Sequence, residues 1–280
     1  MSMMLTGREF ARVLESTEAQ HLARQVETYR KLTNQREAKV VAVSGAVAAF
    51  TTHAFGRKLN HVTGLGMDAP IDSATLVELE AAYFAQGMNI EIDVCPHADS
   101  SVLAALSVRN YHVNAFSNTY ACVLSSFHPD KPVGYIQIVS DRTVIEHLFL
   151  SNSITGFSAQ VSPRPYALLE ALARIATARA DTRLFAAKVD GEIAGTAAMS
   201  IIPTLLGPTA HLYIASTVPQ YRCRGVQVAL LQARLRAARD AGCVAATVTT
   251  RPGSTSARNA ERAGLMLAYT KSTFVKRPED

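Results

Sequence analysis

The sequence predicts an α/β protein with mixed sheets, built from two similar halves. Helical and strand patterns alternate along its 280 residues, of which 48% are hydrophobic and 18% charged, so a sizeable core can form. A helix, a strand, a second helix and a second strand follow one another in both halves, with helix-ending residues at matching places. At roughly 100–200 residues per domain, this length allows two small domains.

The first half is expected to begin with a helix over residues 6–36, which carry an apolar stripe at helical spacing. Residues 39–52 are rich in Val, Ala and Phe and predict a strand. Asp72 or Ser73 is placed to cap a helix that Gly87 ends. The other elements expected in this half are helices over 73–86 and 99–109 and strands over 88–94 and 111–124.

The two halves are expected to join through residues 125–131, which read Ser-Ser-Phe-His-Pro-Asp-Lys and are followed by a proline. In the second half, Asp190-Gly191 between two β-rich runs predicts a hairpin, and residues 151–165 are expected to be irregular. The other elements expected here are strands over 134–139, 183–189, 192–202, 211–218, 243–250 and 265–275, and helices from 141 and over 166–179, 224–241 and 254–263.

The helix-ending residues favour an internal duplication. Gly242 and Gly264 lie 22 positions apart, and Gly87 and Asn110 lie 23 positions apart. Asn follows Gly in its preference for the left-handed end of a helix. We therefore expect tandem domains at residues 1–130 and 131–280, with a chance recurrence of α/β units as the alternative.

The charge pattern argues against a nucleic-acid binder. The net charge of +5 is mild and spread along the chain, whereas such a protein more often gathers its basic residues on one stripe with aromatics between them. The densest basic cluster suggests instead a local anion site and a solvated helix face. It consists of Arg222, Arg224, Arg234, Arg236 and Arg239.

The four cysteines have neither C-x-x-C spacing nor a paired histidine cluster, so we expect no metal site and no disulfide framework. Free thiols fit a reducing, cytoplasmic location. The N-terminus lacks the apolar core of a signal peptide, and no run of 18 apolar residues occurs. Neither export nor a membrane span is therefore expected.

The most informative stretch runs from Thr217 to Leu231, where a β-rich run feeds a short loop and the loop feeds a long helix. Arg222 and Arg224 stand at the start of the helix, and Gly225 stands on its first turn. A helix start has unpaired N–H groups and the positive end of the helix dipole. Glycine there lets a diphosphate approach the backbone, and the arginines add charge and donors. The pattern favours a pyrophosphate site, with a solvated helix start as the alternative.

This stretch resembles the coenzyme A loop of the GNAT acetyltransferase superfamily, whose pattern is Arg/Gln-x-x-Gly-x-Gly/Ala. The chain reads Arg222-Cys-Arg-Gly-Val-Gln227, so that Gln227 departs from the final small residue. The segment from Asn259 to Leu265 resembles the second motif of that family, and the hairpin at 185–199 resembles its central antiparallel strands. The resemblance extends over residues 180–277.

The resemblance implies transfer of an acetyl or short acyl group from acetyl-CoA directly to an amine. In this family the pantetheine lies between two splayed parallel strands, here 211–218 and 243–250, and pairs with the backbone of the first. Asn259 is a further cofactor candidate, and a helix-surface residue is its alternative interpretation. The other implied cofactor contacts are Ser216, Thr217 and Val218 for the pantetheine, and Arg222, Cys223, Arg224, Gly225, Val226, Gln227 and Val228 for the pyrophosphate.

The usual general acid of the family, a Tyr four residues before the Gly of the second motif, is replaced by Ala260. Tyr213 and Tyr269 on the flanking strands are candidate replacements, and His211 is a candidate base. The alternatives are half-buried strand aromatics and a surface histidine. A backbone N–H of the first splayed strand is the candidate oxyanion donor. A covalent role for Cys223 is not expected, because direct transfer needs no nucleophile on the protein.

The corresponding loop of the first half contains Gly64 and Gly66 but no arginine. Asp68 and Asp72 would repel a phosphate at that helix start and are better suited to capping. We expect a degenerate half that does not bind the cofactor and instead shapes the acceptor pocket.

The acceptor is expected to be an amine of a small molecule or peptide, with residues 151–165 and 202–208 bordering its pocket. Neither a nucleic-acid nor a membrane partner is expected, and a homodimer is the assembly considered. A non-catalytic CoA-binding regulator or sensor is the rival function, favoured by the missing Tyr at Ala260 and the lack of an evident base. A third interpretation, a basic nucleic-acid binder, is supported by the net charge alone.

Overall fold

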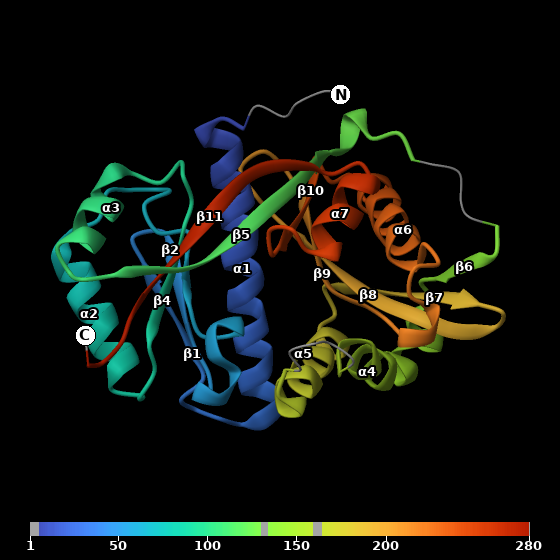
Figure 1. Ribbon diagram of the computed structural model, residues 1–280, viewed down its shortest axis with the longest axis horizontal. Helices are drawn as coiled ribbons and strands as arrows, with labels where there is room; N and C mark the ends of the chain where they lie inside the picture. The colour runs from blue at the N-terminus through green and yellow to red at the C-terminus, as the bar shows by residue number, and fades with distance from the viewer. Residues whose placement is uncertain (1–5, 130–133, 159–163, 280) are drawn as a thin grey trace. The chain divides into compact units, whose positions relative to one another are not determined.

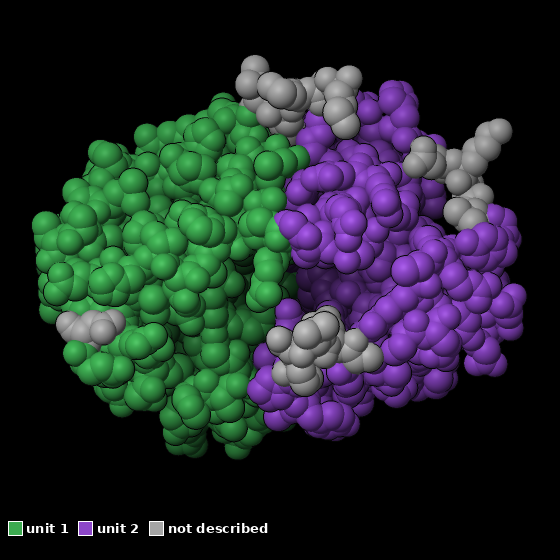
Figure 2. Space-filling model, in the orientation of Figure 1, with its two compact units in different colours: residues 1–119, 249–252, 267–280 green, residues 120–248, 253–266 purple. Residues whose placement is uncertain are grey.

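The computed structural model describes residues 6–129, 134–158 and 164–279 (Figure 1). The chain forms two compact units (Figure 2). The first unit comprises Met1–Thr119, Thr249–Pro252 and Leu267–Asp280, and the second comprises Tyr120–Val248 and Gly253–Met266. The division into domains at 1–130 and 131–280 stays a prediction, whereas the compact units group segments that are distant in the sequence.

The strands of the first unit follow the order β1-β2-β3-β4-β11-β5. Alternate residues of β4 serve different purposes, because successive side chains of a strand point to opposite faces. Ile90 and Ile92 join the core with α2 and α3, and Asp93 interacts with the charges of Arg57 and Lys271. The elements of this unit are α1 (Arg8–Thr33), β1 (Lys39–Val43), β2 (Ala46–Phe50), the 3₁₀ helix η1 (His53–Lys58), β3 (Val62–Thr63), α2 (Ser73–Phe84), β4 (Ile90–Val94), α3 (Ser100–Ser107), and most of β5 (His112–Val123) and β11 (Met266–Lys276).

The strands of the second unit follow the order β5-β10-β9-β8-β7-β6. On β7, Leu184 packs with Phe149 of α4, and the next residue, Phe185, packs in a separate core with Leu230 of α6. The two faces of this sheet therefore carry different helices. The elements of this unit are η2 (Leu124–Ser126), β6 (Ile136–Val139), α4 (Arg142–Ser158), α5 (Tyr166–Ala178), β7 (Thr182–Val189), β8 (Glu192–Ile202), β9 (Thr209–Thr217), η3 (Pro219–Tyr221), α6 (Val226–Asp240), most of β10 (Ala245–Thr250), and α7 (Thr255–Arg262).

Both units repeat one strand topology. β1, β2 and β3 pair antiparallel in turn and β3 is parallel to β4, just as β7, β8 and β9 pair antiparallel in turn and β9 is parallel to β10. All four predicted helix-ending residues have left-handed φ values, of 66° and 59° at Gly87 and Asn110, and of 75° and 92° at Gly242 and Gly264. The predicted α/β fold of two mixed-sheet halves is confirmed.

The closing strands of the two halves are exchanged. β5 follows α3 in the chain, yet the neighbour of β4 is β11, which pairs with it antiparallel over 272–276. In the second unit, the end of β5 leads to Leu124, whose N–H donates to the Val244 carbonyl beside β10 at 3.0 Å. For this reason no single cut in the sequence separates the two units. Of the predicted linker, residues 130–131 lie outside the described residues.

The single strand predicted over 39–52 is wrong. β1 and β2 form a hairpin around Ser44 and Gly45, which have left-handed φ values of 46° and 81°. Two successive residues with positive φ give the turn whose twist matches that of paired strands. The apolar residues on either side hid this two-residue turn, because they form a nearly continuous run in the sequence.

The prediction of irregular structure over 151–165 is also wrong for residues 151–158, which continue α4 as helix. The polar side chains there bond back to carbonyls one turn earlier, as the Thr155 hydroxyl does to Ser151 at 2.9 Å. Ser153 and Ile154 are buried, so tertiary packing outweighs the low helix propensity of this stretch. Residues 159–163 lie outside the described residues.

Candidate cofactor site

The parallel strands β9 and β10 separate along their length. Their ladder consists of three pairs, the last of which joins Thr247 to His211, and β9 continues to Thr217. On its other edge β9 stays paired with β8 up to Thr217. The last six residues of β9 therefore have a partner strand on the β8 side and no ladder to β10 among the described residues.

A bulge lies in this part of β9. Ala198 pairs with Tyr213 and Thr196 pairs with Ser216, so two residues of β9 stand opposite one residue of β8. Ile214 in the bulge has a φ of 44°, a conformation that is costly for a β-branched residue. A bulge bends its strand and redirects nearby backbone groups, and such strain gathers at functional sites.

The loop after β9 leads to an open helix start. Gly225 is the N-cap of α6 with a φ of 79°, and no side chain caps this helix. The first helical bond runs from Ala229 N–H to the Gly225 carbonyl at 3.0 Å. The N–H groups of residues 226–228 therefore stand at the positive end of the helix. A Cβ at Gly225 would meet only Ile136 Cδ1, at 4.0 Å, so the approach to this backbone is open.

The two arginines of the loop point to different partners. Arg222 Nη2 donates to the Gly156 carbonyl of α4 at 3.1 Å. Arg224 Nη2 lies 3.4 Å from Asp190 Oδ2 at an exposed position. Gln227, which departs from the family pattern, donates from Nε2 to Thr217 Oγ1 at 2.8 Å and so connects the helix start to the end of β9.

Helix α4 approaches the end of β9 closely. A Cβ at Gly156 would lie 2.5 Å from Ser216 Oγ and 3.1 Å from the Thr217 nitrogen, so only glycine fits there without a shift. The side chains of Ser216, Thr217 and Val218 are buried. These residues can therefore contact a ligand mainly through the backbone, and the Val218 N–H already donates to the Ala194 carbonyl at 2.9 Å.

Residues 149–264 match the family model described as Acetyltransferase (GNAT) family. This match includes the splayed part of β9, the open start of α6 and all of α7. This part of the chain is therefore similar to the GNAT acetyltransferases. We call the matched region the GNAT domain. No curated protein sequence matches the chain significantly.

Solved structures share the fold over nearly the whole chain. A GCN5-related N-acetyltransferase from Kribbella flavida is 14% identical with a TM-score of 0.59, covering 93% of this chain and 95% of its own. One from Sphaerobacter thermophilus is 13% identical with a TM-score of 0.59, covering 94% of each chain. A tandem GNAT protein from the clavulanic acid biosynthesis pathway is 11% identical with a TM-score of 0.54, covering 94% of this chain and 96% of its own.

The candidate residues His211 and Tyr213 lie two apart on β9, and their rings stack with centroids 6.2 Å apart. His211 is buried, so the alternative interpretation as a surface histidine is wrong. The hydroxyls of Tyr213 and Thr182 are 2.7 Å apart. Burial raises the pKa of Tyr213, which keeps its hydroxyl protonated near neutral pH.

Tyr269 belongs to the first unit, whereas the other predicted site residues of the GNAT domain belong to the second. Its hydroxyl donates to Glu15 Oε1 at 2.7 Å, and burial followed by the charge of Glu15 raises its pKa. Of the two α7 positions, Ala260 is buried in the core against α6, and Asn259 is half-buried. Ala260 therefore offers no hydroxyl at this position.

One further prediction about this unit needs correction, whereas the prediction that residues 202–208 border the acceptor pocket stays a prediction. Arg234 is not on a solvated face of α6: it is buried, and its Nη1 donates to the Ala198 carbonyl at 3.2 Å. Burial lowers the pKa of Arg234 to about 9.

The first unit has no open helix start at the corresponding place. Asp72 caps α2 by accepting from the Thr75 N–H at 2.9 Å, as its sequence position suggested. Asp68 forms an ion pair with Arg12. The Gly66 carbonyl accepts from the N–H of Asp99 at the start of α3 at 2.9 Å, so the loop is packed against its own unit.

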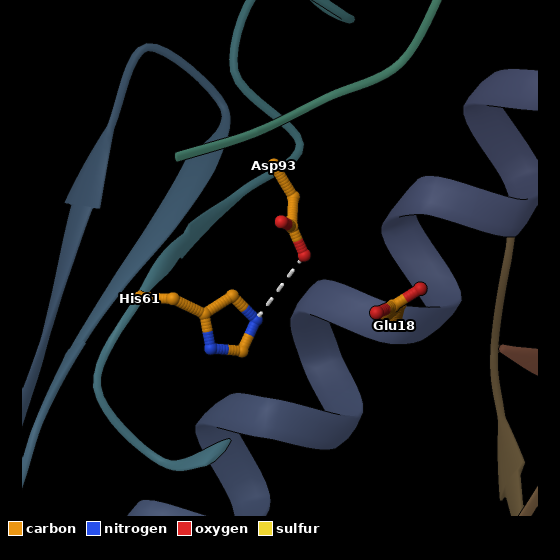
Figure 3. Close-up of side chains that lie close together, drawn as sticks. All are labelled: Glu18, His61 and Asp93. Atoms are coloured by element: carbon orange, nitrogen blue, oxygen red, sulfur yellow. Dashed lines mark ion pairs between the residues drawn. The ribbon is translucent and has the colours of Figure 1, made fainter. Parts of the chain in front are cut away.

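A buried charge cluster in the first unit was not found from the sequence. Glu18, His61 and Asp93 offer oxygen and nitrogen atoms within 4.8 Å of one another (Figure 3). The unit's own cations already occupy the carboxylates: Lys271 Nζ lies 2.8 Å from Glu18 Oε2, and Arg57 pairs with Asp93. This arrangement opposes a metal ion, because the ion would add positive charge beside the buried Lys271 and the half-buried Arg57.

The charges of this cluster set its protonation. Burial lowers the pKa of His61 to about 4, so the ring is neutral near pH 7. Burial would raise the pKa of Asp93, but Arg57 and Lys271 outweigh it and lower that pKa. Burial would likewise lower the pKa of Lys271, but the neighbouring carboxylates raise it. Contributions from α1, η1, β4 and β11 leave no local pattern that a sequence could reveal.

Proposed function

We propose that the GNAT domain transfers an acetyl group from acetyl-CoA to an amine. The observation that carries this proposal is the open, uncapped start of α6 directly after a strand that has left its parallel partner. An anion and an extended amide chain can be held side by side there, as acetyl-CoA requires. The match of residues 149–264 to the acetyltransferase family supports the same substrate.

In this proposal the pyrophosphate lies on the backbone of residues 222–228, where the N–H groups of the first turn of α6 are available. The pantetheine follows the backbone of Ser216 and Thr217, because at Val218 the N–H already donates to the Ala194 carbonyl and the carbonyl already accepts from the Tyr221 N–H at 3.0 Å. Asn259 on α7 is proposed as a further contact. We call the backbone of residues 222–228 the phosphate cradle. The side chain of Gln227 lies at its border, where it donates a hydrogen bond to Thr217 Oγ1.

The chemistry requires an amine without its proton, an oxyanion donor and a proton for the thiolate. The amine nitrogen attacks the thioester carbon, the carbon–sulfur bond breaks, and CoA leaves with a proton. A backbone N–H near the bulge at Ile214 is the proposed oxyanion donor, because the bulge redirects this stretch of β9. Direct attack needs no covalent role for Cys223, which is exposed on the loop.

His211 is the proposed base and Tyr213 the proposed acid, since both lie on β9 and Tyr213 keeps its proton. Tyr269 is the weaker candidate for the acid, because its hydroxyl is already donated to Glu15. Tyr213→Phe and His211→Gln should lower kcat more than they raise KM for acetyl-CoA. An unchanged kcat in either variant would remove that residue from the mechanism.

A small-molecule or peptide amine is the proposed acceptor, and a cytoplasmic location and a homodimer stay predictions. Among the described residues, no helix combines the length and the apolar character needed to cross a membrane. The rival function, a CoA-binding regulator without catalysis, is favoured by Ala260, which removes the usual acid.

The test is the release of free CoA from acetyl-CoA, measured with a panel of primary amines. Amine-dependent release of CoA is expected. The rate of release should fall in a variant whose side chain at position 225 blocks access to the backbone there. Tight acetyl-CoA binding with no release above the slow hydrolysis rate would favour the regulator. No binding at millimolar acetyl-CoA would contradict both functions.

A further inference from the structure

The Arg224 guanidinium lies over two tyrosine rings at the rim of the open helix start. Its guanidinium carbon is 5.9 Å from the centre of the Tyr135 ring and 5.7 Å from that of the Tyr221 ring. The Tyr135 hydroxyl donates to the Arg224 carbonyl at 2.8 Å, which fixes the two residues against each other across 89 positions of sequence. The three side chains therefore form one surface, which we call the Tyr-Arg platform.

The platform adjoins the proposed phosphate cradle. Gly225 follows Arg224 directly, and the residue after Tyr135, Ile136, is the nearest neighbour of a Cβ at Gly225. The Tyr135 side chain is 53% exposed although it is aromatic and hydrogen-bonded, so a face of its ring is open to a ligand. An aromatic face beside an anion cradle fits a base attached to a phosphate.

The two loop arginines are suited to different phosphates. Arg222 is held by the Gly156 carbonyl of α4, on the side of the loop where β9 ends. Arg224 pairs instead with Asp190, and the distance from Nη2 to Oδ2 is 3.4 Å. The Asp190 side chain is 75% exposed. An exposed ion pair of this kind is weak, so a phosphate can replace the carboxylate at small cost.

We propose that the Tyr-Arg platform binds the adenosine 3′-phosphate end of coenzyme A. The purine stacks on the open face of Tyr135, and the Arg224 guanidinium leaves Asp190 to pair with the 3′-phosphate. This inference rests on the proposed function and adds to it a chemical role for Tyr135, a residue outside the loop, and a division of labour between the arginines. It also predicts that the protein distinguishes coenzyme A from its dephosphorylated form.

The test compares the dissociation constants of coenzyme A, 3′-dephospho-CoA and 4′-phosphopantetheine by calorimetry. The unaltered protein should bind coenzyme A at least about tenfold more tightly than 3′-dephospho-CoA, as a charge-assisted bond to phosphate implies. In Arg224→Gln this ratio should fall to near one. In Tyr135→Leu both nucleotide ligands should weaken on the order of tenfold, while Tyr135→Phe keeps the stacking ring, loses only the bond to the Arg224 carbonyl, and should weaken both ligands less.

4′-Phosphopantetheine lacks the nucleotide, so its affinity should be equal in all variants. Arg239→Gln at the other end of α6 and Tyr166→Leu on α5 are matched controls and should change no affinity. A ratio near one in the unaltered protein, or a ratio that survives Arg224→Gln, would overturn the platform and leave the proposed function intact. Normal nucleotide binding by Tyr135→Leu would also overturn it. Failure of all three ligands to bind the unaltered protein would contradict the proposed function itself.

Discussion

Helices α2 and α6 occupy equivalent places in the two units, each after the first of two parallel strands. Asp72 caps the first turn of α2 with its carboxylate. Gly225 begins α6 in a left-handed conformation and leaves the first N–H groups without a side-chain cap. The same fold element is thus capped by a carboxylate of the chain in the first unit and has no side-chain cap in the second.

The strands next to these helices also differ in whether internal side chains cover them. Around β3 and β4 the first unit encloses its own charges, with Lys271 between Glu15 and Glu18 and with Arg57 on Asp93. The end of β9 has small hydroxyl side chains and an edge that β10 does not cover. The two units therefore share one strand topology, but the first unit has internal ion pairs where the second has an uncovered strand edge.

The largest expected effect tests the internal charges of the first unit. Lys271→Met should destabilise the protein by about 3 kcal/mol, because the change leaves the buried carboxylates of Glu15 and Glu18 without their cation. Chemical denaturation measures this loss. Lys31→Met removes an exposed lysine of α1 and should be neutral. Equal stability of the two variants would show that the cluster does not hold the first unit together.

Acid should weaken the first unit by a similar amount. The pKa of His61 is about 4 in the fold and about 6.5 when unfolded, so only the unfolded chain binds this proton between these values. Stability from this residue is fully present above pH 6.5 and is lost as pH falls toward 4, by about 3 kcal/mol in all. His61→Gln should flatten the pH dependence across that window. An unchanged slope would contradict burial of a neutral ring.

The contact between α4 and β9 should show a smaller effect in the second unit. Gly156→Ala places a methyl group against Ser216 and the Thr217 nitrogen, which should cost about 1–3 kcal/mol and weaken acetyl-CoA binding. Gly134→Ala is the matched control, because a Cβ there meets nothing within 4 Å. If both variants bind and unfold alike, α4 does not set the position of the β9 backbone.

The smallest effect is expected at the cap of α2. Asp72→Ala should lower the melting temperature by a few degrees without creating a second acetyl-CoA site, because the loop before α2 remains packed on α3. Asp72→Asn should keep the cap and the melting temperature. A second bound acetyl-CoA in Asp72→Ala would mean that the carboxylate alone separates the two helix starts.

Local signals in the sequence predicted most of the fold. Gly87, Asn110, Gly242 and Gly264 each end an element in the left-handed conformation, and this property belongs to single residues. The exchange of β5 and β11 left no such signal, because a strand's partner depends on the whole sheet. The tail of α4 was missed because buried packing and hydroxyl-to-carbonyl bonds outweigh the low helix propensity of its residues.

For the candidate site, too, the sequence predicted what depends on neighbouring residues and missed contacts between distant ones. The motif placed Gly225 and the arginines at a helix start, since strand, loop and helix are contiguous in the sequence. The approach of Gly156 to Ser216 and of Tyr135 to Arg224 joins residues that are far apart in the chain. The interpretation of His211 as a surface residue failed because its burial depends on the elements that cover β9.

The comparison of the two helix starts is tested most directly by calorimetric titration with acetyl-CoA. We predict one bound acetyl-CoA per chain, with affinity reduced on the order of a hundredfold in Gly225→Asp, which gives α6 the kind of carboxylate cap that α2 has. Asp72→Asn, the matched change in the first unit, should leave affinity and stoichiometry unchanged. Two molecules per chain, or binding that survives Gly225→Asp, would contradict the account.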